Sequence, residues 1–164
     1  LTKDVNDNTY SIIGYELLKT LSDNGTVNRG VCQANGNGNL VSIAERLNIA
    51  KVDGKILCDD TQEPKELSID SQVSMNFWCF SPSIFPYSEK LFNEFLKENI
   101  TNIKSEFFIP IVGDKFINEG GGVIKVIPTS AQWFGVTYKE DAPEVKANLE
   151  ELVKAGEYPA SLWK

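Results

Sequence analysis

The apolar residues of the chain follow two different spacings. In the first half, short runs rich in Val, Ile and aromatic residues alternate with polar turns, which is typical of β-strands. After residue 82, apolar residues recur every three or four positions in several segments, which is typical of amphipathic helices. The predicted order of elements is β, ββ, β, α, α, ββ, α. This order indicates an α/β or α+β fold with a mixed sheet and flanking helices.

The strand predictions rest on apolar runs bounded by turn residues. They cover residues 8–17, both arms of a hairpin within 29–46, the short segments 52–60 and 66–70, and the runs 73–80, 122–128 and 132–138. The hairpin is the best defined, because Asn35-Gly36-Asn37-Gly38 provides the residue types that tight turns with positive φ require. The continuous apolar run 73–80 predicts a strand that is covered on both faces.

Three helices are predicted in the second half of the chain. The first covers about 82–98, and the second covers 106–118 and ends at a run of three glycines. The third has the clearest start. Asp141 precedes Glu144 by three residues, as in a capping box, and Pro143 stands in the first turn.

Length and charge narrow the class of protein. A chain of 164 residues is long enough for one domain with its own core. A net charge of -7 argues against nucleic acid and anionic membranes as partners, because both require clustered positive charge. No apolar run approaches the roughly 20 residues of a membrane helix, and no signal peptide opens the chain, so we expect a soluble, cytoplasmic protein. The first residue is Leu1 rather than Met, which suggests a fragment or a processed product.

The residue types available restrict the chemistry. The chain has no histidine, which excludes Ser-His-Asp and Cys-His catalysis within it. Its three cysteines are widely spaced, so neither a disulfide framework nor a zinc site is indicated. Phosphoryl and nucleotidyl transfer do not need a histidine, because they depend on positioning and charge neutralisation. Arg29 and Arg46 are the only arginines, and arginine is well suited to binding phosphate.

A set of motifs in order along the chain resembles the C-terminal half of the sugar-phosphate nucleotidyltransferases. The motifs are GYELLKTLSDNGTVNRGVC, IAER, VSMNFWCFSPSIF, SEFFIPIV, AQWFGVTYKEDAPEV and YPASLW. The resemblance implies a GT-A-like, Rossmann-related fold. It also implies that the full-length protein transfers a nucleoside monophosphate from a nucleoside triphosphate (NTP) to a sugar 1-phosphate and releases pyrophosphate, with Mg²⁺ as cofactor.

The chain lacks features that the resemblance assigns to the N-terminal half. It has no Gly-rich loop for the triphosphate and no strand-end Asp for the first metal contact, so we expect the isolated chain to be inactive and to need that half as a partner. The second metal-binding Asp of the family corresponds to Gly135. Glu140 or Asp141 are alternatives, since Mg²⁺ requires oxygen ligands, although Asp141 is already explained as a helix cap.

The remaining motifs predict residues that bind the acceptor. By resemblance, Glu45 bonds sugar hydroxyls and Arg46 contacts the sugar phosphate, although a solvated charge pair at a strand end is the simpler interpretation. Asn76 interrupts an apolar strand and either contacts a sugar hydroxyl or bonds a neighbouring backbone group, because a buried amide needs partners. Glu106 lies where the family places an acidic residue near the sugar, and a favourable helix N-terminus explains it almost as well. Lys139 is a weaker candidate for a phosphate contact.

A different class of function is also compatible with the sequence. The chain would then be a non-catalytic module that binds a sugar or phosphosugar, regulates a partner enzyme, or takes part in assembly. Strand edges and apolar surface left without a partner would favour self-association, so a homo-oligomer is a possible state.

Overall fold

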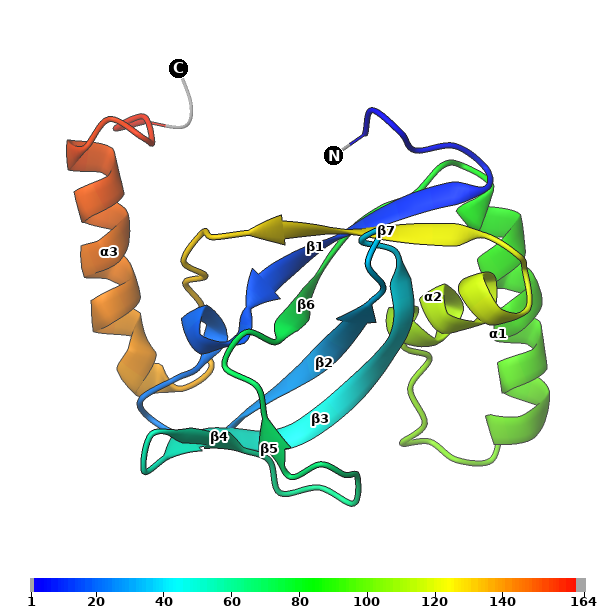
Figure 1. Cartoon of the computed structure of the whole chain (residues 1–164), viewed down its shortest axis with the longest axis horizontal. Coiled ribbons are helices and arrows are strands. Elements are labelled where there is room, and N and C mark those ends of the chain that lie inside the picture. Colours follow the sequence, from blue (N-terminus) through cyan, green and yellow to red (C-terminus); the bar gives the residue numbers. More distant parts are fainter. Residues whose placement is uncertain (1, 162–164) are drawn as a thin grey trace.

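A computed structural model describes residues 2–161 and shows a mixed, curled sheet with helices (Figure 1). The strands are β1 Thr9–Glu16, β2 Val27–Ala34, β3 Leu40–Val52, β4 Lys55–Leu57, β5 Glu66–Leu67, β6 Gln72–Cys79 and β7 Val123–Thr129. Their order in the sheet is β5-β4-β3-β2-β6-β1-β7. Strands β1 and β7 are parallel and all other neighbours are antiparallel. The prediction of a mixed sheet with helices is therefore confirmed.

The predicted hairpin is present as β2 and β3. Asn35 N–H donates to the Asn39 carbonyl at 2.9 Å, and Gly38 has φ 75°, so the glycine provides the left-handed conformation that closes the turn. A second tight turn, Asp53-Gly54, joins β3 to β4, with both residues at positive φ. The hairpin turn could be predicted from the sequence because the conformation of a tight turn depends mainly on its own few residues.

The helices are α1 Ile84–Asn99, α2 Ile109–Asn118 and α3 Ala142–Lys154, with short 3₁₀ turns at Leu17–Thr20 (η1) and Lys139–Asp141 (η2). Helix α2 begins later than predicted, at Ile109, after an extended Phe108. Figure 1 shows α1 and α2 together at one end of the sheet and α3 at the other. No residue of α3 is buried, so this helix packs less closely than α1 and α2.

The prediction of a strand at 132–138 is wrong. After β7 the chain leaves the sheet and approaches η1, where Trp133 N–H and the Gln132 side chain both donate to the Lys19 carbonyl, at 3.4 and 3.1 Å. The apolar run is therefore not a sheet strand. Its polar groups bond to a turn that precedes it by more than a hundred residues.

Two apolar clusters cover the two faces of the sheet. Residues from α1, α2 and the adjacent strands form one cluster, which includes Tyr10, Val112 and Ile124. Residues around η1, β4 and β5 form the other, which includes Leu17 and Ile49. Neighbouring residues on β2, such as Val31 and Cys32, pack against different clusters. Because successive side chains of a strand point to opposite faces, the clusters lie on opposite sides of the sheet.

Strand β6 is irregular near its middle. It pairs with β2 only between residues 30–32 and 72–74, and its register with β1 shifts between Ile12 and Gly14. Residues 75–77 therefore bulge out of the ladder, and Asn76 has φ 56°. The prediction that run 73–80 is covered on both faces is wrong here, since Phe77 is 52% exposed.

None of the helices within residues 2–161 combines the length and apolar composition needed to cross a membrane.

Candidate functional site

A small pocket lies where β2 and β6 stop pairing and diverge, and we call it the fork pocket. Its volume is about 130 Å³. It is lined by Asn28, Arg29, Gly30, Glu45, Ser74, Met75, Asn76 and Pro110. Strands β2, β3 and β6 and the N-terminus of α2 thus contribute to it. Two of the residues predicted to bind the acceptor, Glu45 and Asn76, are among its walls.

Glu45 lies directly opposite Gly30 on the paired strands β3 and β2. A Cβ atom on Gly30 would lie 3.1 Å from Ile43 Cδ1 and 3.5 Å from Glu45 Oε2, so glycine keeps the space beside the carboxylate open. Partial burial raises the pKa of Glu45, and the positive charge of Arg29 opposes this rise. The Glu45 carboxylate can therefore accept hydrogen bonds from a ligand in the open space above Gly30.

Asn76 is at the tip of the β6 bulge. Its backbone is left-handed, a conformation that Asn adopts more readily than most residues, and Asn48 and Asp53 adopt it outside the pocket. Its side chain is exposed, which corrects the expectation of a buried amide. The bulge turns the side chain out of the sheet, so the cost of an unsatisfied buried amide does not arise here.

Arg46 is not part of the fork pocket. It follows Glu45 on β3 and therefore points to the opposite face of the sheet. Its guanidinium forms a buried ion pair with Asp60 (Nε to Oδ2, 2.8 Å). It also donates to the carbonyls of Gln62 and Pro64, at 3.2 and 2.8 Å, and contacts Cys58 Sγ at 2.7 Å. The predicted phosphate contact would have to break this set of bonds, which we call the Arg46 clamp.

Arg29 is a lining residue of the fork pocket, but it lies directly opposite Arg46 on the paired strands, so its side chain points to the same face as Arg46 and away from Glu45. It is 9% exposed, and its guanidinium lies over the Trp133 ring, with Cζ 5.1 Å from the ring centre. It donates through Nη1 to the Asn28 carbonyl at 2.8 Å and through Nη2 to the Thr20 carbonyl. Burial lowers the pKa of Arg29, and Glu45 opposes that change. The one signal in the sequence that drew attention to Arg29 was that the chain has only two arginines.

Glu106 and Lys139 lie outside both the fork pocket and the larger cavity described next. Glu106 is exposed in the segment before α2, and Lys139 is exposed in η2. The structure therefore does not bring these two residues together with Glu45 and Asn76.

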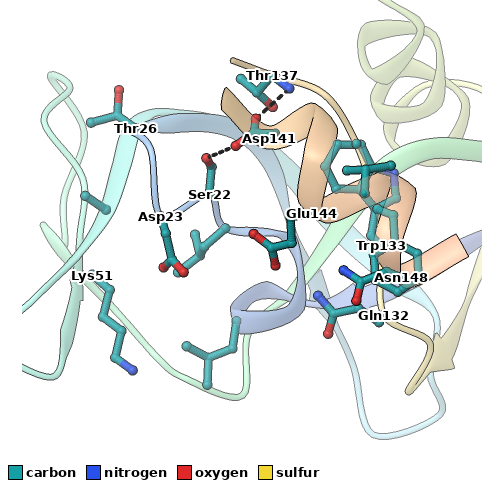
Figure 2. Close-up of a pocket in the computed structure, with 17 residues that line it drawn as sticks. Ser22, Asp23, Thr26, Lys51, Gln132, Trp133, Thr137, Asp141, Glu144 and Asn148 are labelled. Atoms are coloured by element: carbon teal, nitrogen blue, oxygen red, sulfur yellow. Dashed lines mark hydrogen bonds between the residues drawn. The ribbon is translucent and has the colours of Figure 1, made fainter. Parts of the chain in front are cut away.

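A larger cavity, the Trp133 cavity, lies between the loop after η1, the end of β3, the segment after β7, and α3. Its volume is about 720 Å³, and its lining includes Asp23, Lys51, Trp133, Glu144 and Asn148. Figure 2 shows the side chains of Asp23 and Glu144 on two sides of this space, with Ser22 bonded to Asp141 at its edge. The ring of Trp133, which lines this cavity, also contacts the Arg29 guanidinium.

Asp141 joins two distant segments at the edge of the Trp133 cavity. Its carboxylate accepts hydrogen bonds from Ser22 Oγ and Asn24 Nδ2, at 2.9 and 2.6 Å, and from the backbone N–H groups of Thr137 and Tyr138, at 2.9 and 2.7 Å. These bonds, led by the one from Tyr138, lower the pKa of Asp141 to about 2. The predicted cap of α3 is wrong, because Asp141 makes no side-chain cap bond to that helix. Pro143 does stand in its first turn, as predicted.

The described residues do not assemble a metal site. Within residues 2–161, no three Asp, Glu or Cys side chains lie close enough together to hold a metal ion. At position 135, a Cβ atom would lie 1.7 Å from Cη2 of Trp133. The Trp133 ring therefore occupies the space that an Asp side chain at this position would need.

No protein-family model matches the chain, and a search of curated proteins finds no match. The proposal below is therefore supported by the geometry of the fork pocket and by the motifs of the sequence.

Proposed function

We propose that the chain is the acceptor-binding portion of a nucleotidyltransferase that transfers a nucleoside monophosphate from an NTP to a sugar 1-phosphate. The observation that supports this proposal best is the shared position of Glu45 and Asn76 in the fork pocket. A carboxylate, a carboxamide and the Ser74 hydroxyl line one small space, and such groups bind the hydroxyls of a sugar ring. The mixed sheet with flanking helices is compatible with the GT-A-like fold that the motifs imply.

In this proposal the residues of the chain position the acceptor. Glu45 accepts hydrogen bonds from sugar hydroxyls, and Asn76 donates or accepts beside it. The acceptor phosphate then attacks the α-phosphorus of the NTP, a new P–O bond forms, and the bond to the departing pyrophosphate breaks. The partner half supplies the triphosphate loop. Mg²⁺ belongs to the proposal for the full-length protein only, and no step is assigned to it here because the described residues do not fit a metal site.

Binding of sugar 1-phosphates to the chain tests this proposal. A panel of sugar 1-phosphates is titrated by calorimetry into the wild type and into Glu45→Gln. At least one member should bind saturably to the wild type. The substitution should weaken it by about tenfold or more, since a hydrogen bond to a charged group contributes roughly 1.5–3 kcal/mol. Glu89→Gln, on the exposed surface of α1, is the matched control. Binding to no member, or equal binding to both proteins, would contradict the proposal.

A role in assembly is the second candidate, and one observation favours it. Several large apolar side chains are exposed on or next to α1 and α2, namely Phe85, Phe92, Ile103, Phe108 and Ile111. Exposed apolar surface of this kind is typical of protein–protein contacts. Sedimentation of the wild type and of Phe85→Ser/Phe92→Ser tests it: a wild-type oligomer that the double substitution dissociates would support this role, and a monomer at all concentrations would not.

A further inference from the structure

We propose that the Trp133 cavity binds a short, uncharged oligosaccharide. The cavity shares no lining residue with the fork pocket, so this inference does not rest on the proposed function. Its volume of about 720 Å³ lies within the range of roughly 300–1,000 Å³ that is typical of small-molecule sites. The fork pocket, at about 130 Å³, is several times smaller. The Trp133 cavity therefore suits a larger ligand than the fork pocket does.

The polar walls of the cavity carry side chains whose hydrogen-bonding capacity is unused. The carboxylates of Asp23 and Glu144 and the carboxamide of Asn148 form no hydrogen bond or ion pair with other residues of the described part of the chain, 2–161. Glu144 and Asn148 are four positions apart on α3 and so lie on one face of that helix. Figure 2 shows Asp23 across the same space from Glu144. Carboxylates accept hydrogen bonds and a carboxamide both donates and accepts, which is what neighbouring sugar hydroxyls require.

Trp133 and Phe134 form an aromatic wall, against which the C–H face of a sugar ring can pack. Both side chains line the cavity and are half-buried. Contacts within the chain hold the Trp133 ring in place. Its backbone N–H donates to the Lys19 carbonyl at 3.4 Å, and Cζ of Arg29 lies 5.1 Å from the ring centre. The ring also packs so closely on Gly135 that a Cβ there would lie 1.7 Å from Cη2. A wall that is already ordered lowers the entropic cost of binding.

The charges of the lining argue against other classes of ligand. The lining contains three carboxylates, of Asp23, Asp141 and Glu144, and one ammonium group, of Lys51, so a phosphate or a nucleotide would be repelled. A wholly apolar ligand would remove water from the carboxylates without replacing its hydrogen bonds. An organic cation would pair with the carboxylates but would leave the Asn148 carboxamide unused, and the experiment has to separate this alternative.

Nuclear magnetic resonance tests the inference through the indole N–H signal of Trp133, which Trp133→Phe identifies by its loss. The ¹⁵N-labelled wild type is titrated with maltotriose, cellotriose and triacetylchitotriose, and separately with spermidine. We expect a saturable shift with at least one trisaccharide, equal at about 0.05 and 0.5 M NaCl because salt does not screen a neutral ligand. The Trp78 signal is the internal control, since its Nε1 donates to Asn76 outside the cavity at 3.5 Å. No trisaccharide shift at Trp133, equal shifts of both signals, or a response to spermidine alone would overturn the inference.

Substitutions provide a second measurement. Glu144→Gln and Asp23→Asn should each weaken trisaccharide binding by about tenfold, because each replaces a charged acceptor with a neutral one. Glu151→Gln, which changes another exposed acid of α3 outside the lining, is the matched control and should not. Both target side chains are exposed, so the variants should fold, and the backbone spectrum checks this. Unchanged affinity in folded Glu144→Gln and Asp23→Asn would overturn the inference.

The two proposals fail separately. Glu45→Gln should leave trisaccharide binding unchanged, since Glu45 does not line the Trp133 cavity. Binding of a sugar 1-phosphate that depends on Glu45 would leave the proposed function standing whatever the trisaccharides do.

Discussion

The two sides of β3 at Glu45 and Arg46 differ in how fully their polar groups are bonded within the chain. On one side, the Arg46 clamp joins a buried guanidinium to Asp60 and to a loop of the chain. On the other side, Glu45 borders a pocket whose lining also includes a left-handed Asn76. A saturated set of bonds stabilises a fold, whereas polar side chains that border a pocket keep hydrogen-bonding capacity for a ligand.

The comparison predicts that the largest stability loss follows from opening the clamp. Arg46→Gln leaves Asp60 buried without its cation, and the melting temperature should fall by roughly 10 °C, because breaking a buried ion pair is strongly destabilising. Calorimetry measures the melting temperature, and Lys51→Gln on the same strand is the control. Sugar 1-phosphate affinity of the folded variant should be unchanged, since Arg46 does not line the fork pocket. A melting temperature equal to that of the wild type would remove the distinction between the two sides of β3.

Gly135→Ala tests the packing of the Trp133 ring against Arg29. The new methyl group would meet the Trp133 ring, which has to move and lose its contact with Arg29. We expect a loss of about 1–3 kcal/mol in the free energy of unfolding, as for an overpacked site. Denaturant unfolding followed by fluorescence reports both effects. Gly36→Ala is the matched control, since a Cβ at Gly36 meets no atom within 4 Å. Equal stability of the two variants would argue against this packing.

Asp141 gives a prediction that depends on pH. Its pKa in the folded chain is about 2, below the value of about 3.9 for an unfolded aspartate, so its carboxylate stabilises the fold above pH 4. This contribution is lost as the pH falls from about 4 to about 2. The melting temperature of Asp141→Asn should therefore be lower than that of the wild type at pH 6, and the difference should shrink towards pH 2.

Ser22→Ala is the control for this measurement. It removes one of the four donors and keeps the carboxylate, so its melting temperature should fall less, with the same direction of pH dependence. If the difference in melting temperature between wild type and Asp141→Asn did not change with pH, the stabilisation by the hydrogen bonds of Asp141 would not depend on its charge.

The smallest expected effect is a gain in stability. Asn76→Gly removes the cost of a left-handed conformation and should stabilise the chain by about 0.5 kcal/mol, while sugar 1-phosphate binding weakens because the amide is lost. Asp53→Gly, at φ 49° in the β3–β4 turn, should give a similar gain without any change in binding. Unfolding curves and titrations of both variants separate strain from function. A loss of stability in Asn76→Gly alone would mean that the amide stabilises the bulge.

The sequence by itself determined most elements of the fold. The hairpin of β2 and β3, helix α1 and the start of α3 near Pro143 follow from turn residues and apolar spacing, and both are properties of adjacent residues. The sequence also suggested Glu45 and Asn76 as ligand contacts, through motifs that resemble those of a family, and both line the fork pocket. It failed at 132–138, where an apolar and aromatic run suggested a strand but the partners were the carbonyl of Lys19 and the guanidinium of Arg29.

Only the tertiary structure decided which partners hold each arginine and what Asp141 does. Arg29 and Arg46 are equivalent in type and opposite in the sheet, and their roles differ because different distant segments pack against them. The Ser22–Asp141 bond likewise joins residues 119 positions apart. Such contacts depend on how the sheet curls and where its strands part. Those features follow from the packing of the whole chain rather than from the preferences of neighbouring residues.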